Sequence, residues 1–225
     1  MRVAVKLGGH AFPYPPNPEA LSAHADALIK IKQASNILAV VTGGGQAARA
    51  YIDAARKMDA EEGTCDQLGI EMSRLNAQLL ILKLRNQAYP TPPHTLQEVK
   101  KLMDTGKIIV LGGLSPGHST TAVGALVAEA IKAQMYIISS DVEGIYTADP
   151  KTHPSAKKLS KITTQQALDM ALRGRIWAGT YQLDPLAVKV IERSKTPTRF
   201  IDGRDPRNLQ RASAGEDIGT LITNE

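Results

Sequence analysis

The sequence predicts an α/β protein whose mainly parallel β-sheet is covered by helices on both faces. Along the chain, short apolar runs typical of buried strands alternate with longer amphipathic segments typical of helices. Three of the apolar runs end directly in glycines, as strand ends at a ligand site do. The length of 225 residues suffices for one large α/β domain or two small ones.

Up to residue 141 the predicted elements follow a regular strand–helix order. Four apolar runs are predicted as strands: Val3–Leu7, Ile37–Val41, Lys107–Gly113 and Met135–Asp141. Four segments are predicted as helices: 18–33, Gln46–Asp59, about Thr64–Leu84, and 119–133. This order is typical of strands that run parallel and are joined by crossover helices.

After Asp141 the pattern changes. Residues 142–163 are polar, contain two prolines, and are expected to form an exposed loop or hairpin. Two further helices are predicted at about Thr163–Leu172 and Leu183–Ser194, and two late strands at 197–201 and 220–223. Neither a repeat nor an obvious interdomain linker interrupts the chain, which favours a single domain.

The glycines follow three of the predicted strands, in KLGGH (6–10), TGGGQ (42–46) and LGGLSPGHST (111–120). In a parallel sheet these strand ends lie at one edge, where ligands bind and helix N-termini offer free N–H groups and partial positive charge. One glycine pair alone is more often a tight turn. Three together predict loops whose backbone N–H groups reach phosphate oxygens.

Two basic residues accompany these glycines. Lys6 lies within an otherwise apolar strand, where a lysine is costly unless it has a partner or reaches the strand end. Arg49 follows the triple glycine by one helical turn; by itself it is equally well a solvated surface residue. Phosphoryl transfer needs positive charge at such positions. The P-loop pattern is absent, and GGGQAA fits the dinucleotide-binding pattern only loosely.

The composition narrows the classes of partner. A net charge of +5 suits a protein that handles phosphates. Nucleic-acid binding is the weaker interpretation, because Lys and Arg are dispersed and only Trp177, six Tyr and two Phe are available to stack on bases. Cys65 is the only cysteine, so no internal disulfide is expected. No apolar run has the length of a signal peptide or a membrane span, and a cytoplasmic enzyme is expected.

Taken together, the motifs resemble the archaeal-type UMP kinases of the amino acid kinase superfamily. The stretches that carry the resemblance are VKLGG, VTGGGQAARAYI, LGIEMSRLNAQLL, GGLSPGHSTTAVGALVAE, DVEGIYTADP and GTYQLDPLAVKVIERS. They cover essentially the whole chain in order. Single motifs are shared across the superfamily, whereas the combination of GGGQAAR, the LGIEMSRLNA helix and the GHSTTA loop is specific to the UMP kinase branch.

The resemblance implies one amino acid kinase domain over residues 1–225. Its fold is a three-layer αβα sandwich around a mostly parallel sheet of about eight strands. The acceptor would bind to about residues 1–135 and ATP to about residues 136–225. The implied reaction, part of pyrimidine nucleotide biosynthesis, transfers the γ-phosphoryl group of ATP to UMP with Mg²⁺, giving UDP and ADP, without a separate metal site on the protein. The implied assembly is a homohexamer built as a trimer of dimers.

Site residues follow from the resemblance by position. Lys6 and Arg49 would be catalytic. The ATP-binding residues would be Lys6, Gly8, Gly9, His10, Gly45, Arg49, Ser140, Asp141, Tyr146 and Asp149. The UMP-binding residues would be Gly43, Gly44, Asp66, Leu114, Ser115, Pro116, Gly117, His118, Ser119 and Thr120. Among these, Asp66 would accept hydrogen bonds from the ribose diol. Its alternative role is to complement the N-terminal dipole of its helix.

The chain departs from the family pattern at the donor side. His10 stands where the family has serine or lysine, and a histidine beside phosphates can donate a hydrogen bond or titrate near neutral pH. Ser140–Gly144 reads SDVEG instead of TNVDG, so Asp141 adds a negative charge and Glu143 is longer than aspartate. The resemblance therefore predicts the phosphoryl acceptor, UMP, more firmly than the phosphoryl donor.

Two other functions remain open at this point. The first is a superfamily kinase with another acceptor, such as an aspartate or glutamate kinase or an isopentenyl phosphate kinase. The former usually carry extra regions, and the latter have a different glycine loop. The second is an anion or molybdate storage protein on the same fold, which would need clustered polar ligands. The histidines at positions 10, 24, 94, 118 and 153 are not clustered in the sequence.

Overall fold

The computed structural model describes residues 1–148, 153–172 and 183–224. Seven strands form the main sheet, in the spatial order β3-β2-β1-β4-β8-β9-β7. The strands are β1 (Arg2–Leu7), β2 (Ile37–Thr42), β3 (Ile109–Leu111), β4 (Met135–Ser140), β7 (Lys161–Thr163), β8 (Thr198–Asp202) and β9 (Thr220–Thr223). Their pairing is parallel except between β8 and β9. The predicted α/β class and mostly parallel sheet are confirmed.

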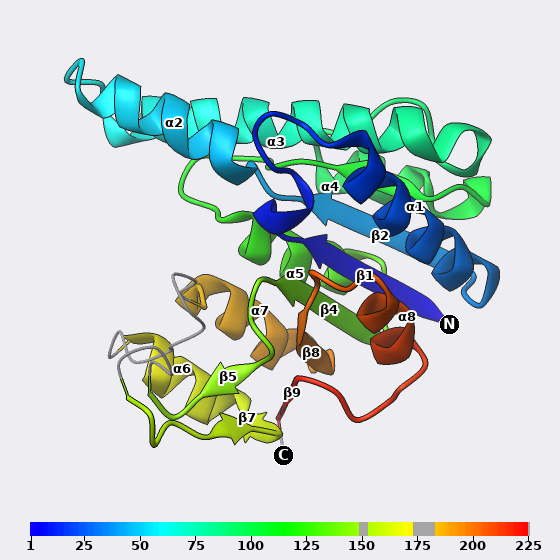
Figure 1. The fold of residues 1–225 in the computed structure, drawn as a ribbon. Helices are drawn as coiled ribbons and strands as arrows, with labels where there is room; N and C mark the ends of the chain where they lie inside the picture. The colour runs from blue at the N-terminus through cyan, green and yellow to red at the C-terminus, as the bar shows by residue number, and fades with distance from the viewer. Residues whose placement is uncertain (149–152, 173–182, 225) are drawn as a thin grey trace.

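Helices cover both faces of this sheet (Figure 1). One face packs against α1 (Pro18–Gln33), α3 (Glu62–Leu84) and α8 (Arg207–Ser213). The other packs against α4 (Leu96–Lys101), α5 (Thr120–Ala130), α6 (Thr164–Leu172) and α7 (Pro185–Ser194). A further helix, α2 (Gly45–Arg56), lies along α3, and the two project together beyond the sheet. The short 3₁₀ helices are η1 (Gly9–Ala11), η2 (Arg85–Gln87) and η3 (Met103–Thr105).

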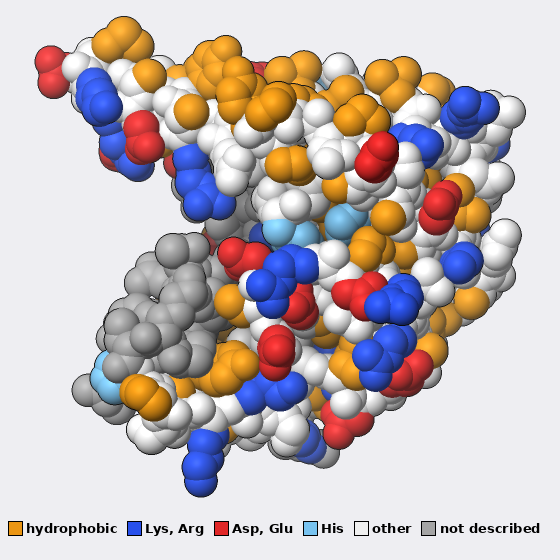
Figure 2. All heavy atoms as spheres, in the orientation of Figure 1, with side chains coloured by type: hydrophobic (Ala, Val, Ile, Leu, Met, Phe, Trp, Pro, Cys, Tyr) orange, Lys and Arg blue, Asp and Glu red, His pale blue; other side chains and the backbone are white. Residues whose placement is uncertain are grey.

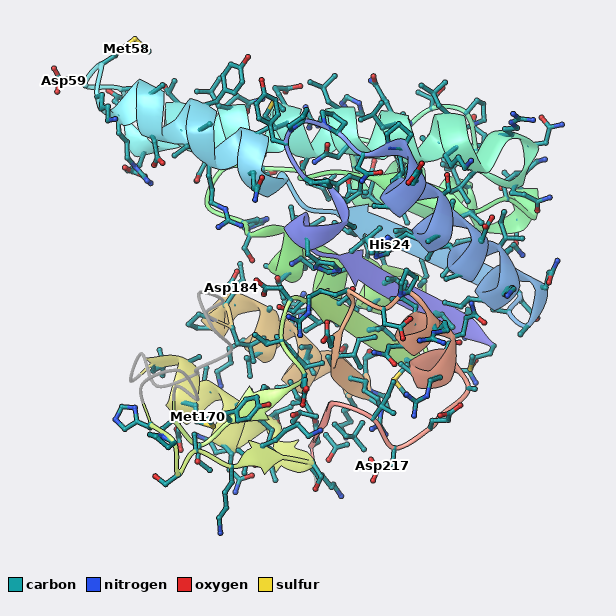
Figure 3. The ribbon with its side chains drawn as sticks, in the orientation of Figure 1. His24, Met58, Asp59, Met170, Asp184 and Asp217 are labelled. Atoms are coloured by element: carbon teal, nitrogen blue, oxygen red, sulfur yellow. The ribbon has the colours of Figure 1, made fainter. Side chains whose placement is uncertain are left out.

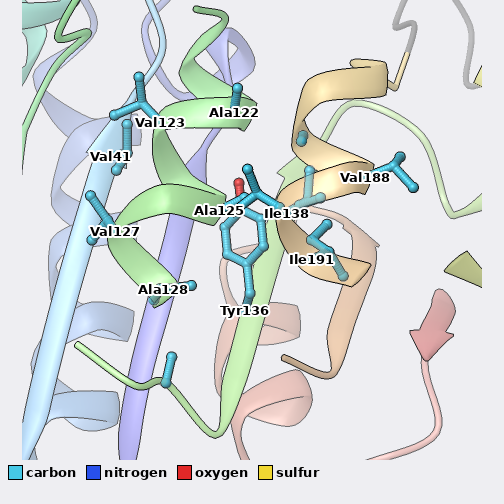
Figure 4. Close-up of a cluster of buried hydrophobic side chains, with 14 of the residues drawn as sticks. Val41, Ala122, Val123, Ala125, Val127, Ala128, Tyr136, Ile138, Val188 and Ile191 are labelled. Carbon is cyan, nitrogen blue, oxygen red and sulfur yellow. The ribbon is translucent and has the colours of Figure 1, made fainter. Parts of the chain in front are cut away.

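The central strands are buried on both faces, which explains their continuous apolar sequence. On β1, Val3, Val5 and Leu7 belong to the core beneath α1 and α3, whereas Ala4 belongs to the core beneath α5. Figure 4 shows this second core, in which Tyr136 of β4 lies between α5 and α7. Its hydroxyl donates to the Thr121 carbonyl at 2.9 Å, so the one polar group of this large side chain is satisfied.

The sheet has a topological switch point between β1 and β4. The chain leaves β1 through α1 to reach β2 on one side, whereas β3 returns through α5 to β4 on the other. β1 and β4 stay paired in parallel as far as Leu7 and Ser139, and the strand order reverses between them. Ligands of open α/β sheets bind at such a point.

Several element boundaries differ from the sequence-based prediction. Two short helices, α4 and α8, were missed because neither has an apolar stripe long enough to be recognised. The predicted strand Lys107–Gly113 is shorter, since only Ile109–Leu111 pairs with β2. Within the segment 142–163, predicted as an exposed loop or hairpin, β5 (Ile145–Tyr146) and β6 (Lys158–Leu159) do form an antiparallel pair. The prediction was wrong for its end, because β7 joins the main sheet beside β9 and buries Ile162. Among the described helices, none is long and apolar enough to cross a membrane.

Candidate active site

A polar cavity of about 290 Å³ occupies the switch point. The residues that line it come from β1 and the loop after it, from α2, and from the end of β4: Lys6, Gly8, Gly9, His10, Arg49, Ser140 and Asp141. In Figure 2 the surface is hollowed beside the α2–α3 projection, and histidine side chains lie at the inner end of the hollow. Seven of the predicted ATP-binding residues are thus brought together, although they are 135 residues apart at the extremes.

Lys6 is the buried cation of this cavity. Lys6 is the second-to-last residue of β1, just before the glycines, and it is only 5% exposed. Burial lowers the pKa of the Lys6 ammonium to about 8; Asp141 opposes this shift and Arg49 adds to it. At pH 7 the side chain is still largely protonated, so the cavity presents a poorly hydrated positive charge, which acts strongly on an anion.

The glycine loops contact one another through their backbones. A Cβ atom on Gly9 would lie 2.8 Å from Gly45 Cα, and Gly45 has a left-handed φ of +71°. The sequence attributed these glycines to a close approach by phosphate. In the structure they are required already for the first and second loops to pack against each other, and this contact directs both toward the same cavity.

Helix α3 holds these loops in place through buried polar side chains. Asn76 Nδ2 donates to the Gly43 carbonyl at 2.8 Å. Ser73 Oγ accepts from Gly113 N–H at 2.7 Å, and Thr42 Oγ1 donates to the Ser73 carbonyl at 2.8 Å. The LGIEMSRLNA motif therefore has a definite role, which the sequence alone did not reveal. Its polar residues tie the second and third glycine loops to one rigid helix.

His10 differs from the sequence-based expectation. Burial lowers the pKa of its imidazole to about 4, and the nearby charges of His24 and Lys6 act in the same direction. His10 therefore does not titrate near neutral pH, as the sequence had suggested, but stays uncharged there. Its Nε2 lies 3.2 Å from Ser139 Oγ, so the ring is part of the cavity wall and available for neutral hydrogen bonding.

A second cavity, of about 210 Å³, lies on the other side of the α2 N-terminus. Its lining comes from α2, α3 and the loop before α5: Gly44, Gly45, Ala48, Ile52, Asp66, Gly69, Ile70, Gly113, His118, Ser119 and Thr120. Five of the predicted UMP-binding residues are among them, namely Gly44, Asp66, His118, Ser119 and Thr120, together with Gly45, which was predicted to bind ATP. The two cavities adjoin where Gly9, at the edge of the first, packs against Gly45, at the edge of the second.

Asp66 is already engaged in this second cavity. Its Oδ2 accepts a hydrogen bond from Gly117 N–H at 2.7 Å, across 51 residues of sequence. The residue stands in the second turn of α3, not at its first residues, and its carboxylate points to the loop. Asp66 therefore holds the 114–120 loop, and its remaining oxygen can accept further bonds.

Some predicted residues lie away from the cavity linings. Gly43 is buried behind the second loop, and Leu114, Ser115, Pro116 and Gly117 continue the third loop outside the lining. Tyr146, on β5, is not part of the first cavity; its hydroxyl lies 3.5 Å from Glu143 Oε2. Asp149 lies outside the described residues.

Asp184 is a site residue that sequence reasoning missed. Its Oδ1 caps α7 by accepting from Leu186 N–H at 2.8 Å, and its Oδ2 accepts from Ser119 Oγ. Ser119 in turn caps α5 by accepting from Ala122 N–H at 3.1 Å. The two helix N-termini are thus joined beside Ser119, which lines the second cavity, and Figure 3 labels Asp184 at the start of α7. An aspartate directly before a proline-initiated helix was the available signal.

Comparison with known proteins yields consistent matches. A family model described as the amino acid kinase family matches residues 1–202. A curated uridylate kinase from Hyperthermus butylicus is 41% identical over 222 residues, covering 98% of this chain and 97% of the relative. One from Methanothermobacter thermautotrophicus is 40% identical over 226 residues, with full coverage of both chains. The solved structure of uridylate kinase from Archaeoglobus fulgidus is 39% identical, with a TM-score of 0.89 over 99% of this chain and 100% of that one.

Proposed function

The chain belongs to the amino acid kinase family, and we propose that it is a uridylate kinase, which transfers the γ-phosphoryl group of ATP to UMP. The observation that carries the proposal is full-length identity of about 40% to curated uridylate kinases, in a chain whose two cavities adjoin at the glycine loops. A kinase needs two nucleotide sites whose phosphates meet. The two cavities, one on each side of the α2 N-terminus, have that arrangement.

The ATP phosphates would occupy the first cavity. Lys6 and Arg49 supply the positive charge, and the backbone of Gly8 and Gly9 supplies N–H donors. Because the transferred group spreads negative charge over its oxygens in the transition state, Lys6 acts where that charge develops. Neutral His10 adds a hydrogen-bonding group without a second full charge.

The UMP ribose and base would occupy the second cavity. Asp66 would accept from the ribose hydroxyls with the oxygen that Gly117 does not use. The 114–120 loop would read the uracil edge with backbone groups, since uracil offers two carbonyls and one N–H. The adenosine part of ATP would extend from the first cavity toward Ser140, Tyr146 and Asp149, as the motif positions imply.

Magnesium would enter with ATP. Among the described residues no group of three or more His, Cys, Asp or Glu is close enough to hold a metal ion. The ion would therefore be held mainly by phosphate oxygens, and Asp141, the carboxylate in the lining of the first cavity, would assist. When bound, Mg²⁺ supplies neutralising charge to the phosphates.

The protein would assemble as a homohexamer, a trimer of dimers, and work in the cytoplasm. Support for assembly comes from the outer face of α3, where Leu75, Leu79 and Leu82 are 50%, 36% and 72% exposed. Beside them an apolar groove runs between α1 and α3. Large leucines exposed in a row along one helix are typical of a covered surface.

A coupled assay of ADP formation tests the function directly. With Mg-ATP, UMP should be turned over in preference to CMP, dUMP, TMP, aspartate and glutamate. Release of ADP with an amino acid but not with UMP would indicate the superfamily kinase with another acceptor. Binding of molybdate without any turnover would indicate the storage protein.

A further inference from the structure

His24 is a buried histidine that the proposed reaction does not use. It lies on α1, is 4% exposed, and is labelled in Figure 3. Its Nδ1 lies 2.8 Å from the Ala20 carbonyl oxygen, one turn earlier in the same helix. Its Nε2 lies 3.0 Å from the Gly203 carbonyl oxygen, 179 residues away.

Both contacts have the same hydrogen-bonding requirement. A carbonyl oxygen only accepts, so each ring nitrogen must present an N–H. A neutral imidazole has one N–H and one lone pair, and an imidazolium has two N–H groups. The observed arrangement is therefore satisfied only by the doubly protonated ring. A neutral ring would direct a lone pair at one of the two carbonyl oxygens, at a distance of 3.0 Å or less.

Gly203 connects His24 to the first cavity. Its N–H donates to the Ser140 carbonyl at 2.7 Å, and Ser140 lines the cavity beside Asp141. The glycine is also wedged against Ser139 and His10, because a Cβ atom there would collide with Ser139 Oγ and His10 Nε2. The position of Gly203 therefore decides how Ser140 and His10 stand in the cavity wall.

We propose that His24 is a positioning residue for the phosphate cavity and that it acts as a doubly protonated ring that clamps Gly203 to α1. When the ring loses its second proton, the Gly203 contact turns from a hydrogen bond into a repulsion. The segment around Gly203 then moves away from α1, and the cavity wall at Ser140 and His10 loosens. Phosphoryl transfer slows as pH rises through this step.

Other charged and titratable groups lie on the elements packed against α1, and none of them replaces the His24 contact to Gly203. From the packed elements they are His10 on η1, Asp202 and Arg204 beside Gly203, Arg207 and Arg211 on α8, and Lys83 on α3. Arg204, Arg207 and Arg211 are each paired with a carboxylate. The His10 and His24 ring centroids are 5.8 Å apart, so a charged His24 opposes a charge on His10.

A magnetic-resonance experiment tests the clamp without relying on the proposed function. In the full chain labelled with ¹⁵N histidine and glycine, a long-range ¹H–¹⁵N spectrum at pH 6 should show both His24 nitrogens carrying protons. On raising the pH, the Gly203 amide should shift with the same midpoint as the His24 ring. A ring with one proton at pH 6, or a Gly203 amide that stays still while the ring titrates, overturns the proposal.

A kinetic experiment tests the consequence for the reaction and does rest on the proposed function. His24→Gln offers a donor to only one of the two carbonyls. Wild-type kcat should fall about fivefold to tenfold across the ring midpoint, the equivalent of one hydrogen bond. His24→Gln should lack this step and stay at the lower rate. Ser22→Ala is the matched control, since it removes a 2.7 Å bond to Pro18 in the same helix without reaching Gly203.

The two experiments separate the possible failures. If the enzyme does not phosphorylate UMP, the spectrum still decides whether His24 clamps Gly203. If UMP is phosphorylated and His24→Gln keeps the wild-type step, His24 does not position the cavity and the proposal is wrong. The proposal is also wrong if both Ser22→Ala and His24→Gln lose the pH-dependent fall in kcat, because the fall then depends on α1 in general and not on His24.

Discussion

Lys6 and His10 lie four residues apart at the end of β1, and burial lowers the pKa of both with different consequences. Lys6 keeps its proton at pH 7 because its pKa falls only to about 8. His10 loses its proton because its pKa falls to about 4. The cavity thus combines one charged and one neutral side chain, a combination that the residue types alone do not reveal.

The first prediction concerns the charge of Lys6. Lys6→Ala should lower kcat about a hundredfold or more, because it removes a group that stabilises the transition state, and should change the KM for UMP little. In wild type, kcat/KM for ATP should fall as the pH rises through about 8, where the ammonium loses its proton. Lys6→Arg keeps the charge and should remove this fall. Initial-rate kinetics between pH 6 and 9.5 measure both. A fall of only a few-fold in Lys6→Ala means that the lysine is structural.

The second prediction concerns His10. With a pKa of about 4, the ring is neutral from pH 5 to 8 in the folded protein. The pH–rate profile of His10→Ser should therefore have the same shape as that of wild type over this range, although its level changes with the lost contact to Ser139. Parallel profiles of the two proteins measure this. If the wild-type rate changes with pH between 5 and 8 and the His10→Ser rate does not, His10 titrates in that range and the prediction is wrong.

The third prediction concerns Asp66. Removing a carboxylate that bonds the ribose diol costs about 1.5–3 kcal/mol, so Asp66→Ala should raise the KM for UMP about tenfold to a hundredfold. The KM for ATP should hardly change, because Asp66 lines only the second cavity. The preference for UMP over dUMP should narrow. If Asp66→Ala lowers the melting temperature but leaves the KM for UMP unchanged, Asp66 does not bind UMP.

At the scale of helices and strands, the third glycine loop depends on contacts from two directions. Asp66 on α3 holds Gly117, and Asp184 at the start of α7 holds Ser119 at the start of α5. These bonds join segments that the sheet alone does not connect. Losing either contact should therefore affect the second cavity, which Asp66 and Ser119 line, more than the first.

The fourth prediction uses Asp184. Asp184→Ala removes the cap of α7 and the bond from Ser119, and should destabilise the protein by about 1–2 kcal/mol and raise the KM for UMP. Asp184→Asn is the matched control, since asparagine caps equally well and its amide oxygen can accept one of the two bonds. Denaturant unfolding and UMP kinetics measure the two effects. If Asp184→Ala and wild type have equal KM values for UMP, Asp184 only caps α7 and does not support the second cavity.

At the scale of the whole molecule, the exposed leucines of α3 lie on the opposite side of that helix from the residues that hold the glycine loops. Ser73 and Asn76 are buried against the glycine loops, whereas Leu75, Leu79 and Leu82 are exposed. Assembly through α3 would therefore add rigidity to the helix that holds the glycine loops between the two cavities.

The fifth prediction concerns this assembly. Light scattering should give wild type a mass six times that of the chain, independent of concentration. Leu79→Glu combined with Leu82→Glu should lower the mass, because a buried interface cannot accommodate two unpaired carboxylates. Substituting Met58, which is exposed at the far tip of α2, by glutamate is the control and should leave the mass unchanged. A wild-type monomer contradicts the prediction.

The succession of the central strands and helices along the chain, the strand ends that carry the glycines, and the family could all be predicted from the sequence. Apolar runs and helical spacing are local patterns, and the glycines and Lys6 keep fixed offsets from the strands, so these features can be read without distances. The boundaries of α2 and α3 were less accurate, because the turn at Asp59, with φ of +58°, has no sequence signal of its own.

The protonation of the site residues and the contacts that support them became evident only from the folded chain. The pKa of His10 depends on burial and on a backbone hydrogen bond with Gly203 that raises it, and the role of Asp66 depends on Gly117, which lies 51 residues away. Likewise, Asn76 reaches Gly43, and His24 reaches the Gly203 carbonyl, only because α1 and α3 pack on one face of the sheet. Desolvation and long-range hydrogen bonds depend on distances between segments, and those distances exist only once the chain has folded.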